Sequence, residues 1–96
     1  MSEVRLIARA AAREGKAEEL KALLAGMVKP TRAEAGCKFY EFFASNEPGV
    51  FYFNELWQSR EHLKAHEASM HFVEILGKAK DLTDGPMRVD FLTEVK

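Results

Sequence analysis

The chain has 96 residues, of which 47% are hydrophobic and 30% charged, and its formal net charge at pH 7 is −1. This length predicts a single domain over residues 1–96, and the composition excludes a disordered tail. The net charge is close to zero, so the sequence lacks the excess of basic residues that is typical of proteins that bind nucleic acid or an anionic membrane. No apolar run approaches the roughly 20 residues needed to span a bilayer, and the single cysteine, Cys37, favours a reducing cytoplasm.

The N-terminal part of the chain alternates in hydrophobicity and then changes to a helical period. Alternation over Val4–Ala11 predicts a strand that is partly buried on both faces. After a turn at Gly15, apolar residues spaced three and four apart predict a helix over residues 16–29. Pro30 is expected to kink or restart this helix, and Gly36 to stop it.

The middle of the chain predicts an aromatic hairpin followed by a second helical region. Cys37–Ala44 and Val50–Trp57 are rich in aromatic residues, and an Asn-Glu-Pro-Gly turn separates them. Ser59 has the character of a helix N-cap, which predicts a helix over residues 60–80 with a break near Ser69.

Alternating residues over 87–95 predict a last strand. The order β-α-β-β-α-β is that of the ferredoxin-like α+β fold, a four-stranded antiparallel sheet with helices on one face. Because the strands carry apolar residues on both faces, the face away from the helices needs a cover. A second copy of the chain is the simplest cover, so we expect a homodimer.

The end of the aromatic hairpin carries polar residues that suggest a site. Glu55 shares a strand face with Trp57 and two phenylalanines, and an unpaired buried carboxylate is costly. Glu55 is either paired with an arginine or helix N-terminus at the sheet end, or a pocket carboxylate that orients a histidine or a substrate hydroxyl. Trp57 is either a core residue or a wall on which a ligand stacks. Tyr40 either donates a hydrogen bond to a substrate oxygen or caps the sheet edge.

Three histidines follow on the second helical region. His66 shares a helix face with Leu63 and so is expected to point inward, either as a general base or as a hydrogen-bonded core residue. His62 and His66 have the spacing of two metal ligands, but the pattern lacks the internal glutamate of zinc proteases, and a third ligand would have to be Glu55 or His71. We therefore predict no metal.

Known cofactor motifs are absent from the sequence. It contains no Gly-x-Gly-x-x-Gly, no Walker loop and no Cys-x-x-Cys. These absences remove local support for dinucleotides, ATP or an iron–sulfur cluster, so we predict no cofactor.

Three segments together resemble the antibiotic biosynthesis monooxygenase domain family, which includes small quinol monooxygenases. They are Glu-Ala-Gly-Cys-Lys-Phe-Tyr at 34–40, Glu-Leu-Trp at 55–57, and Leu-Lys-Ala-His-Glu-Ala-Ser-Met-His at 63–71. The resemblance implies a ferredoxin-like protomer paired sheet to sheet in a dimeric α+β barrel, with a pocket between sheet and helices. Haem-degrading relatives carry an axial histidine where this chain has Gly77, so haem degradation is not expected.

The resemblance also implies roles for residues. Many relatives oxidise a quinol or polyphenol with molecular oxygen and without flavin, metal or haem. Carried over, His66 is the catalytic base and Glu55 its orienting carboxylate, while Trp57 and Tyr40 contact the substrate. Asn54 is expected to contact a substrate oxygen if its strand face lines the pocket, and His71 is placed among the substrate-binding residues.

Two other functions remain open from the sequence. One is an isomerase that acts on a phosphorylated diketone of the autoinducer-2-phosphate type, which would need a cradle of basic residues around the phosphate. The other is a non-catalytic dimeric ligand-binding protein.

Overall fold

The computed structural model describes residues 2–96. Its element order confirms the predicted ferredoxin-like α+β arrangement, with each expected helical region divided into two. The elements in chain order are β1 (Val4–Ala11), α1 (Ala17–Ala25), α2 (Val28–Arg32), β2 (Cys37–Ala44), β3 (Val50–Trp57), α3 (Arg60–Glu67), α4 (Met70–Ala79) and β4 (Arg88–Leu92).

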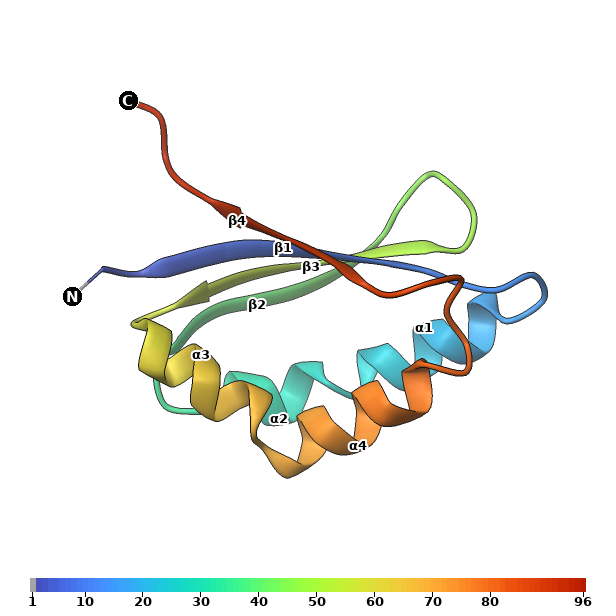
Figure 1. The fold of residues 1–96 in the computed structure, drawn as a ribbon, viewed down its shortest axis with the longest axis horizontal. Helices are drawn as coiled ribbons and strands as arrows, with labels where there is room; N and C mark the ends of the chain where they lie inside the picture. The colour runs from blue at the N-terminus through green and yellow to red at the C-terminus, as the bar shows by residue number, and fades with distance from the viewer. Residues whose placement is uncertain (1) are drawn as a thin grey trace.

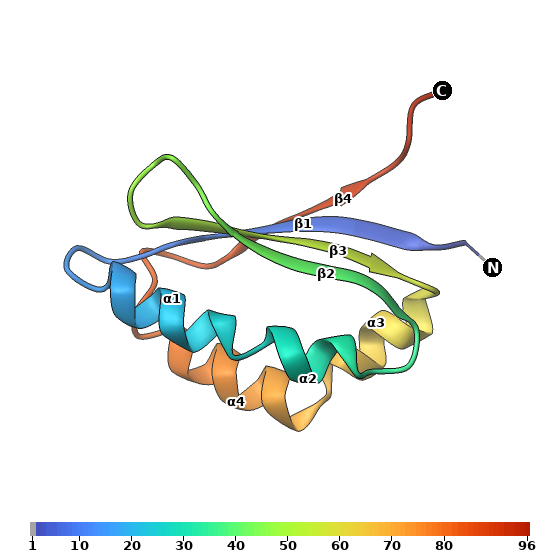
Figure 2. The ribbon, with the colours of Figure 1, turned by 180° about the vertical axis from the view of Figure 1, so that it is seen from behind.

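The strands form one open sheet in the order β2-β3-β1-β4, with every neighbouring pair antiparallel. All the helices lie against one face of this sheet, as Figures 1 and 2 show from opposite sides. The sheet therefore has an inner face, which the helices cover, and an outer face, which they leave open.

The first helical region breaks earlier than predicted. α1 ends at Ala25 and α2 begins at Val28, so the break falls at Gly26 and Met27, not at Pro30. Pro30 instead occupies the first turn of α2, where its missing N–H has no helical partner to lose. The break predicted near Ser69 is confirmed, because the Ser69 side chain accepts a hydrogen bond from the Phe72 N–H and caps α4.

The last strand is shorter than the predicted span of 87–95. β4 pairs with β1 only from Arg88, opposite Arg9, to Leu92, opposite Arg5. Beyond Leu92 the chain leaves the sheet on the side away from the helices (Figures 1 and 2). Residues 93–96 therefore make no backbone pairing with β1 and are not part of the strand.

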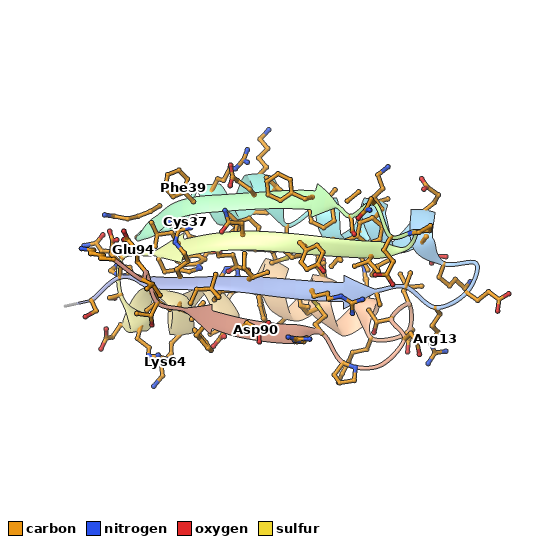
Figure 3. All side chains as sticks on the ribbon, turned by 90° about the horizontal axis from the view of Figure 1, so that it is seen from above. Arg13, Cys37, Phe39, Lys64, Asp90 and Glu94 are labelled. Carbon is orange, nitrogen blue, oxygen red and sulfur yellow. The ribbon has the colours of Figure 1, made fainter. Side chains whose placement is uncertain are left out.

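The core lies between the inner face and the helices. It contains alternate residues of β1 and β3, the buried leucines of α1 and Leu63 of α3. The outer face, seen from above in Figure 3, keeps large apolar side chains in contact with solvent. Phe39 and Phe43 on β2 are 52% and 50% exposed, and Leu92 on β4 is 43% exposed.

Candidate active site

Strand β3 decides which of the predicted site residues face the helices. Phe53, Glu55 and Trp57 are buried on the inner face, where Glu55 lies opposite Leu6 of β1 and Tyr40 of β2. Asn54 lies between them in sequence and therefore points to the outer face. This alternation resolves the question of which face of β3 lines a pocket.

Helix α3 places His66 over the end of this strand. Ser59 caps the helix by accepting a hydrogen bond from the His62 N–H at 3.2 Å. Leu63 and His66 share the buried face of the helix, and His66 is only 2% exposed. Its ring lies on the Trp57 indole, with ring centroids 4.6 Å apart.

Glu34, in the turn between α2 and β2, hydrogen-bonds the His66 ring. Glu34 Oε2 lies 2.8 Å from His66 Nδ1 and 2.6 Å from His71 Nε2. An ionised carboxylate only accepts hydrogen bonds, so Nδ1 of His66 carries the proton in this arrangement. The opposite ring nitrogen, Nε2, has no hydrogen-bond partner in the described part of the chain. His66 is thus held in the tautomer whose Nε2 lone pair can accept a proton.

The α2–β2 turn reaches His66 because it packs closely on α3. Gly36 adopts φ +81°, and a Cβ at this position would lie 2.2 Å from the His62 ring. The Gly36 carbonyl also accepts a hydrogen bond from the Gln58 N–H at 2.8 Å, which ties the turn to the end of β3. Only glycine combines this backbone conformation with this close approach.

Glu55 is the acidic group of the inner face. Its Oε1 accepts a hydrogen bond from the Trp57 indole N–H at 3.0 Å. Burial raises the pKa of Glu55 to about 7, and the nearby carboxylates of Glu67 and Glu34 act in the same direction, while the bond from Trp57 opposes them. Near neutral pH this side chain is therefore present both as a carboxylate and as a carboxylic acid.

Burial also sets the charge of the two rings beside Glu55. It lowers the pKa of His66, against the opposing effect of the hydrogen bond that His66 donates to Glu34, so the imidazole is neutral at pH 7. Burial and the Glu55 carboxylate both raise the pKa of Tyr40, which keeps its phenol protonated. The Tyr40 and His66 rings meet edge to face at 5.7 Å between centroids. The site thus presents a neutral base beside a protonated phenol.

A cavity of about 120 Å³ lies between the inner face and helices α3 and α4. Its polar lining comes from Tyr40, Glu55, His66 and Glu67, and the rest of the wall is apolar. Three of the six residues predicted for the site therefore border one small void. A base, a hydrogen-bond donor and a carboxyl group around an apolar chamber can deprotonate a bound hydroxyl and hold the resulting anion.

The other three predicted residues lie elsewhere. Trp57 is completely buried behind His66 and is not part of the cavity wall, so it supports the imidazole instead of forming a ligand-stacking wall. His71 contacts Glu34 and Ser69, with its ring centroid 6.1 Å from that of His66, and it does not line the cavity. Asn54 hydrogen-bonds Arg5 and Glu41 on the outer face, so the condition for its contact with a substrate oxygen is not met.

The carboxylate that orients His66 is Glu34, not Glu55 as predicted. Sequence reasoning missed this role because Glu34 lies in a turn, 32 residues from its partner, where no periodicity marks a side chain as inward-facing. The glycine two residues later was the available signal, since it indicates a close backbone approach in this turn.

The two histidines whose spacing resembles that of metal ligands have different partners, because the His62 ring hydrogen-bonds Ser59 at 2.7 Å and the His66 ring contacts Glu34. The side chains that converge are instead Glu34, His66 and His71, whose nearest donor atoms lie within 4.8 Å of one another. One Glu34 oxygen lies 2.8 and 2.6 Å from the two rings, closer than the roughly 3.3 Å between ligands that surround a tetrahedral zinc ion. These distances fit shared hydrogen bonds better than ligation.

Comparison with known proteins identifies the family. Residues 3–78 match the family described as antibiotic biosynthesis monooxygenase. The chain belongs to this family. The match extends over β1 to most of α4 and so includes every residue that lines the polar side of the cavity. The resemblance carried by segments 34–40, 55–57 and 63–71 is therefore confirmed.

Individual relatives are similar to this chain in sequence, and two of them also in solved structure. Putative monooxygenase Rv0793 of Mycobacterium tuberculosis is 35% identical over 91 residues, which cover 95% of this chain and 90% of the relative. The structure of Rv0793 superposes with a TM-score of 0.92 over 99% of this chain and 97% of that chain. PA3566 of Pseudomonas aeruginosa also gives 0.92, at 30% identity, over 100% and 97% of the two chains. Putative monooxygenase YcnE of Bacillus subtilis is 31% identical over 75 residues, which cover 77% of this chain and 79% of the relative.

Proposed function

We propose that this chain is a monooxygenase that oxidises a small aromatic quinol or polyphenol with molecular oxygen, using only its own side chains. The observation that carries the proposal is the 120 Å³ cavity bordered by His66, Tyr40 and Glu55. Membership of the antibiotic biosynthesis monooxygenase family supports the reaction class. We further propose that residues 1–96 form one such domain, and the single cysteine supports a cytoplasmic location.

The proposed reaction begins with removal of a phenolic proton. Molecular oxygen is a triplet and reacts slowly with closed-shell molecules, whereas a phenolate can transfer an electron to it directly. His66 Nε2 takes the phenolic proton, while Glu34 holds the ring and stabilises the imidazolium. The Tyr40 phenol and the acid form of Glu55 donate hydrogen bonds to the phenolate. One oxygen atom of O₂ enters the substrate, and the other leaves as water with two hydrogen atoms from the substrate.

The alternative of a phosphorylated diketone finds less support. A substrate phosphate requires positive charge or backbone donors around it. No lysine or arginine belongs to the described lining of the cavity, and His66 is neutral at pH 7. The strand residues Arg5, Arg9 and Arg88, which would be candidates for a phosphate cradle, lie on the outer face of the sheet, away from the cavity. A non-catalytic protein would be favoured if side chains closed the space beside His66. A cavity of about 120 Å³ lies there instead.

The outer face supports a homodimer as part of this proposal. Exposed apolar side chains on β2 and β4 gather on this face, and a second copy stacked sheet to sheet would cover them. Such a pair is the dimeric α+β barrel that the family resemblance implies. Within residues 2–96, none of the helices combines the length and the apolar character that a membrane-spanning helix requires.

The direct test is oxygen consumption by the purified, chelator-treated protein with methylhydroquinone as substrate. We expect uptake well above that of buffer, with one atom of ¹⁸O₂ in the product. His66→Gln should reduce the rate by about 10²-fold or more, which is the contribution of a general base. His62→Gln is the matched control, because His62 is on the same helix but outside the cavity. Uptake no faster than buffer, or equal rates for both variants, would refute the proposal.

Glu34→Gln separates orientation from substrate contact in the same assay. Glu34 does not line the cavity, so its substitution should lower kcat while leaving KM nearly unchanged. A rise in KM with unchanged kcat would contradict the orienting role.

A further inference from the structure

A second void lies beside the cavity, on the α4 side of the molecule. It is a groove of about 480 Å³ between α4 and the loop that leads into β4. Apolar side chains dominate its wall, with Lys80 and Thr83 as the polar contributors. A groove of this size is within the range of small-molecule sites.

The groove and the cavity share part of their lining. Phe72, Leu76 and Met87 belong to both walls, so these three side chains separate the two voids. Phe72 also meets the His66 ring edge to face, with centroids 5.0 Å apart. A ligand that displaces the side chains of this partition would occupy both voids while one end touches His66.

The sizes of the two voids limit what each can hold. The cavity, at about 120 Å³, is slightly smaller than the roughly 150 Å³ cavity that accommodates benzene in an engineered protein. It is therefore too small for two fused rings and holds at most one six-membered ring. Any larger part of a substrate has to lie in the groove.

The groove has the chemistry of a site for a hydrocarbon chain. Gly77 lies in its wall, and a Cβ built at this position meets no atom within 4 Å. The missing side chain leaves open space on an otherwise continuous helix face. We infer that the substrate of the proposed reaction is a single-ring quinol that carries an apolar side chain, with the ring in the cavity and the chain in the groove. This inference rests on the proposed function for its chemistry, but not for its binding geometry.

The binding test uses 4-alkylphenols from methyl to heptyl, below their micellar concentrations, with the full-length protein and isothermal titration calorimetry. Because 4-alkylphenols are poor substrates for oxidation, they report binding alone. The dissociation constant should fall by about three- to four-fold for each added methylene, the value expected for complete transfer from water to an apolar site. A dissociation constant that does not change with chain length would overturn the inference.

Gly77→Leu fills the groove and tests where the chain lies. This variant should remove most of the chain-length dependence and leave 4-methylphenol binding within about twofold of the original protein. It should fold normally, because leucine favours a helix over glycine and the added side chain meets open space. Ala22→Leu, at an exposed position of α1 outside the groove, is the matched control and should keep the full dependence. Equal dependence in both variants would overturn the inference.

Oxygen uptake with the corresponding alkylhydroquinones separates this inference from the proposed function. Oxidation of methylhydroquinone with no gain in kcat/KM for longer chains would overturn the inference and leave the function standing. Chain-length-dependent binding of the phenols without oxygen uptake on any hydroquinone would support the groove assignment and refute the function.

Discussion

The two faces of strand β3 differ in what surrounds them. On the inner face Glu55 lies among aromatic rings, with the Trp57 indole as its hydrogen-bond donor. On the outer face Asn54 is half-buried and bridges Arg5 at 3.3 Å and Glu41 at 3.0 Å. The two residues are neighbours in sequence, yet one contributes to a cavity wall and the other to a surface network.

This difference shows that environment gives a polar side chain its chemistry. Burial raises the pKa of Glu55 to about 7, so a carboxyl group that is ionised in water is partly protonated here. On the outer face, polar groups are paired with one another and stay close to solvent. The inner face is thus suited to proton transfer, and the outer face to contact with another molecule.

Replacing Glu55 should expose the largest difference between the faces. A pKa raised from 4.5 to about 7 means that the folded chain binds this proton more tightly than the unfolded chain. That contribution to stability is complete below pH 4.5 and is lost as the pH rises to 7. Glu55→Gln keeps an acceptor for Trp57 but does not ionise. It should therefore be more stable than the original protein at pH 8, by about 3 kcal/mol relative to their difference at pH 4.5.

Urea denaturation at pH 4.5, 6 and 8 measures this effect. Glu41→Gln, on the outer face, is the matched control and should differ from the original protein by no more than about 0.5 kcal/mol at each pH. The lowered pKa of His66 destabilises the fold below its ordinary value of 6.5, but it does so equally in all three proteins. A constant difference between Glu55→Gln and the original protein would contradict the buried-carboxyl interpretation.

Disrupting the outer face should have a smaller effect, on association instead of folding. Phe43 is 50% exposed on β2 and belongs to the proposed contact with a second copy. Phe43→Lys should raise the dimer dissociation constant by about 30-fold, which corresponds to roughly 2 kcal/mol for an interface residue of high importance. Sedimentation velocity over a range of protein concentrations would measure this change.

A matched substitution on the helix layer controls for the added charge. Val73 of α4 is 60% exposed and lies on the opposite side of the molecule from the outer face. Val73→Lys should leave the dissociation constant unchanged. If both variants dissociate alike, or if the original protein is monomeric throughout, the outer face is not the dimer contact.

The fold could be predicted from sequence because its determinants are local. Alternation marked β1, the turn at Asn46 to Gly49 marked the hairpin, and Ser69 marked the helix break, all within a few residues of the feature they specify. The misplaced break in the first helical region has the same origin. Proline is tolerated in a first turn, so the position of Pro30 did not decide where the helix divides.

The site could be predicted only in part because its contacts are not local. Glu55 and His66 stood out, since a carboxylate among aromatics and an inward-facing histidine are unusual for their elements. The partner of His66 is set by how closely the α2–β2 turn approaches α3, and that distance depends on packing across 32 residues of chain. The two alternatives for Trp57, a core residue or a ligand-stacking wall, stayed open for the same reason, because sequence does not show which side of the His66 ring the indole occupies.

Asn54→Ala should give the smallest effect, and it tests whether the outer face of β3 takes any part in substrate binding. Asn54 hydrogen-bonds two side chains on the outer face but lines no part of the cavity. Its loss removes two partly exposed hydrogen bonds, so the free energy of unfolding should fall by about 1 kcal/mol or less. The rate of quinol oxidation should stay within twofold, because the neighbouring residues Phe53 and Glu55 keep their positions on the inner face. A strong rise in KM for the quinol would mean that the outer face, too, contacts substrate, and the division of β3 into a chemical and an associating face would then be wrong.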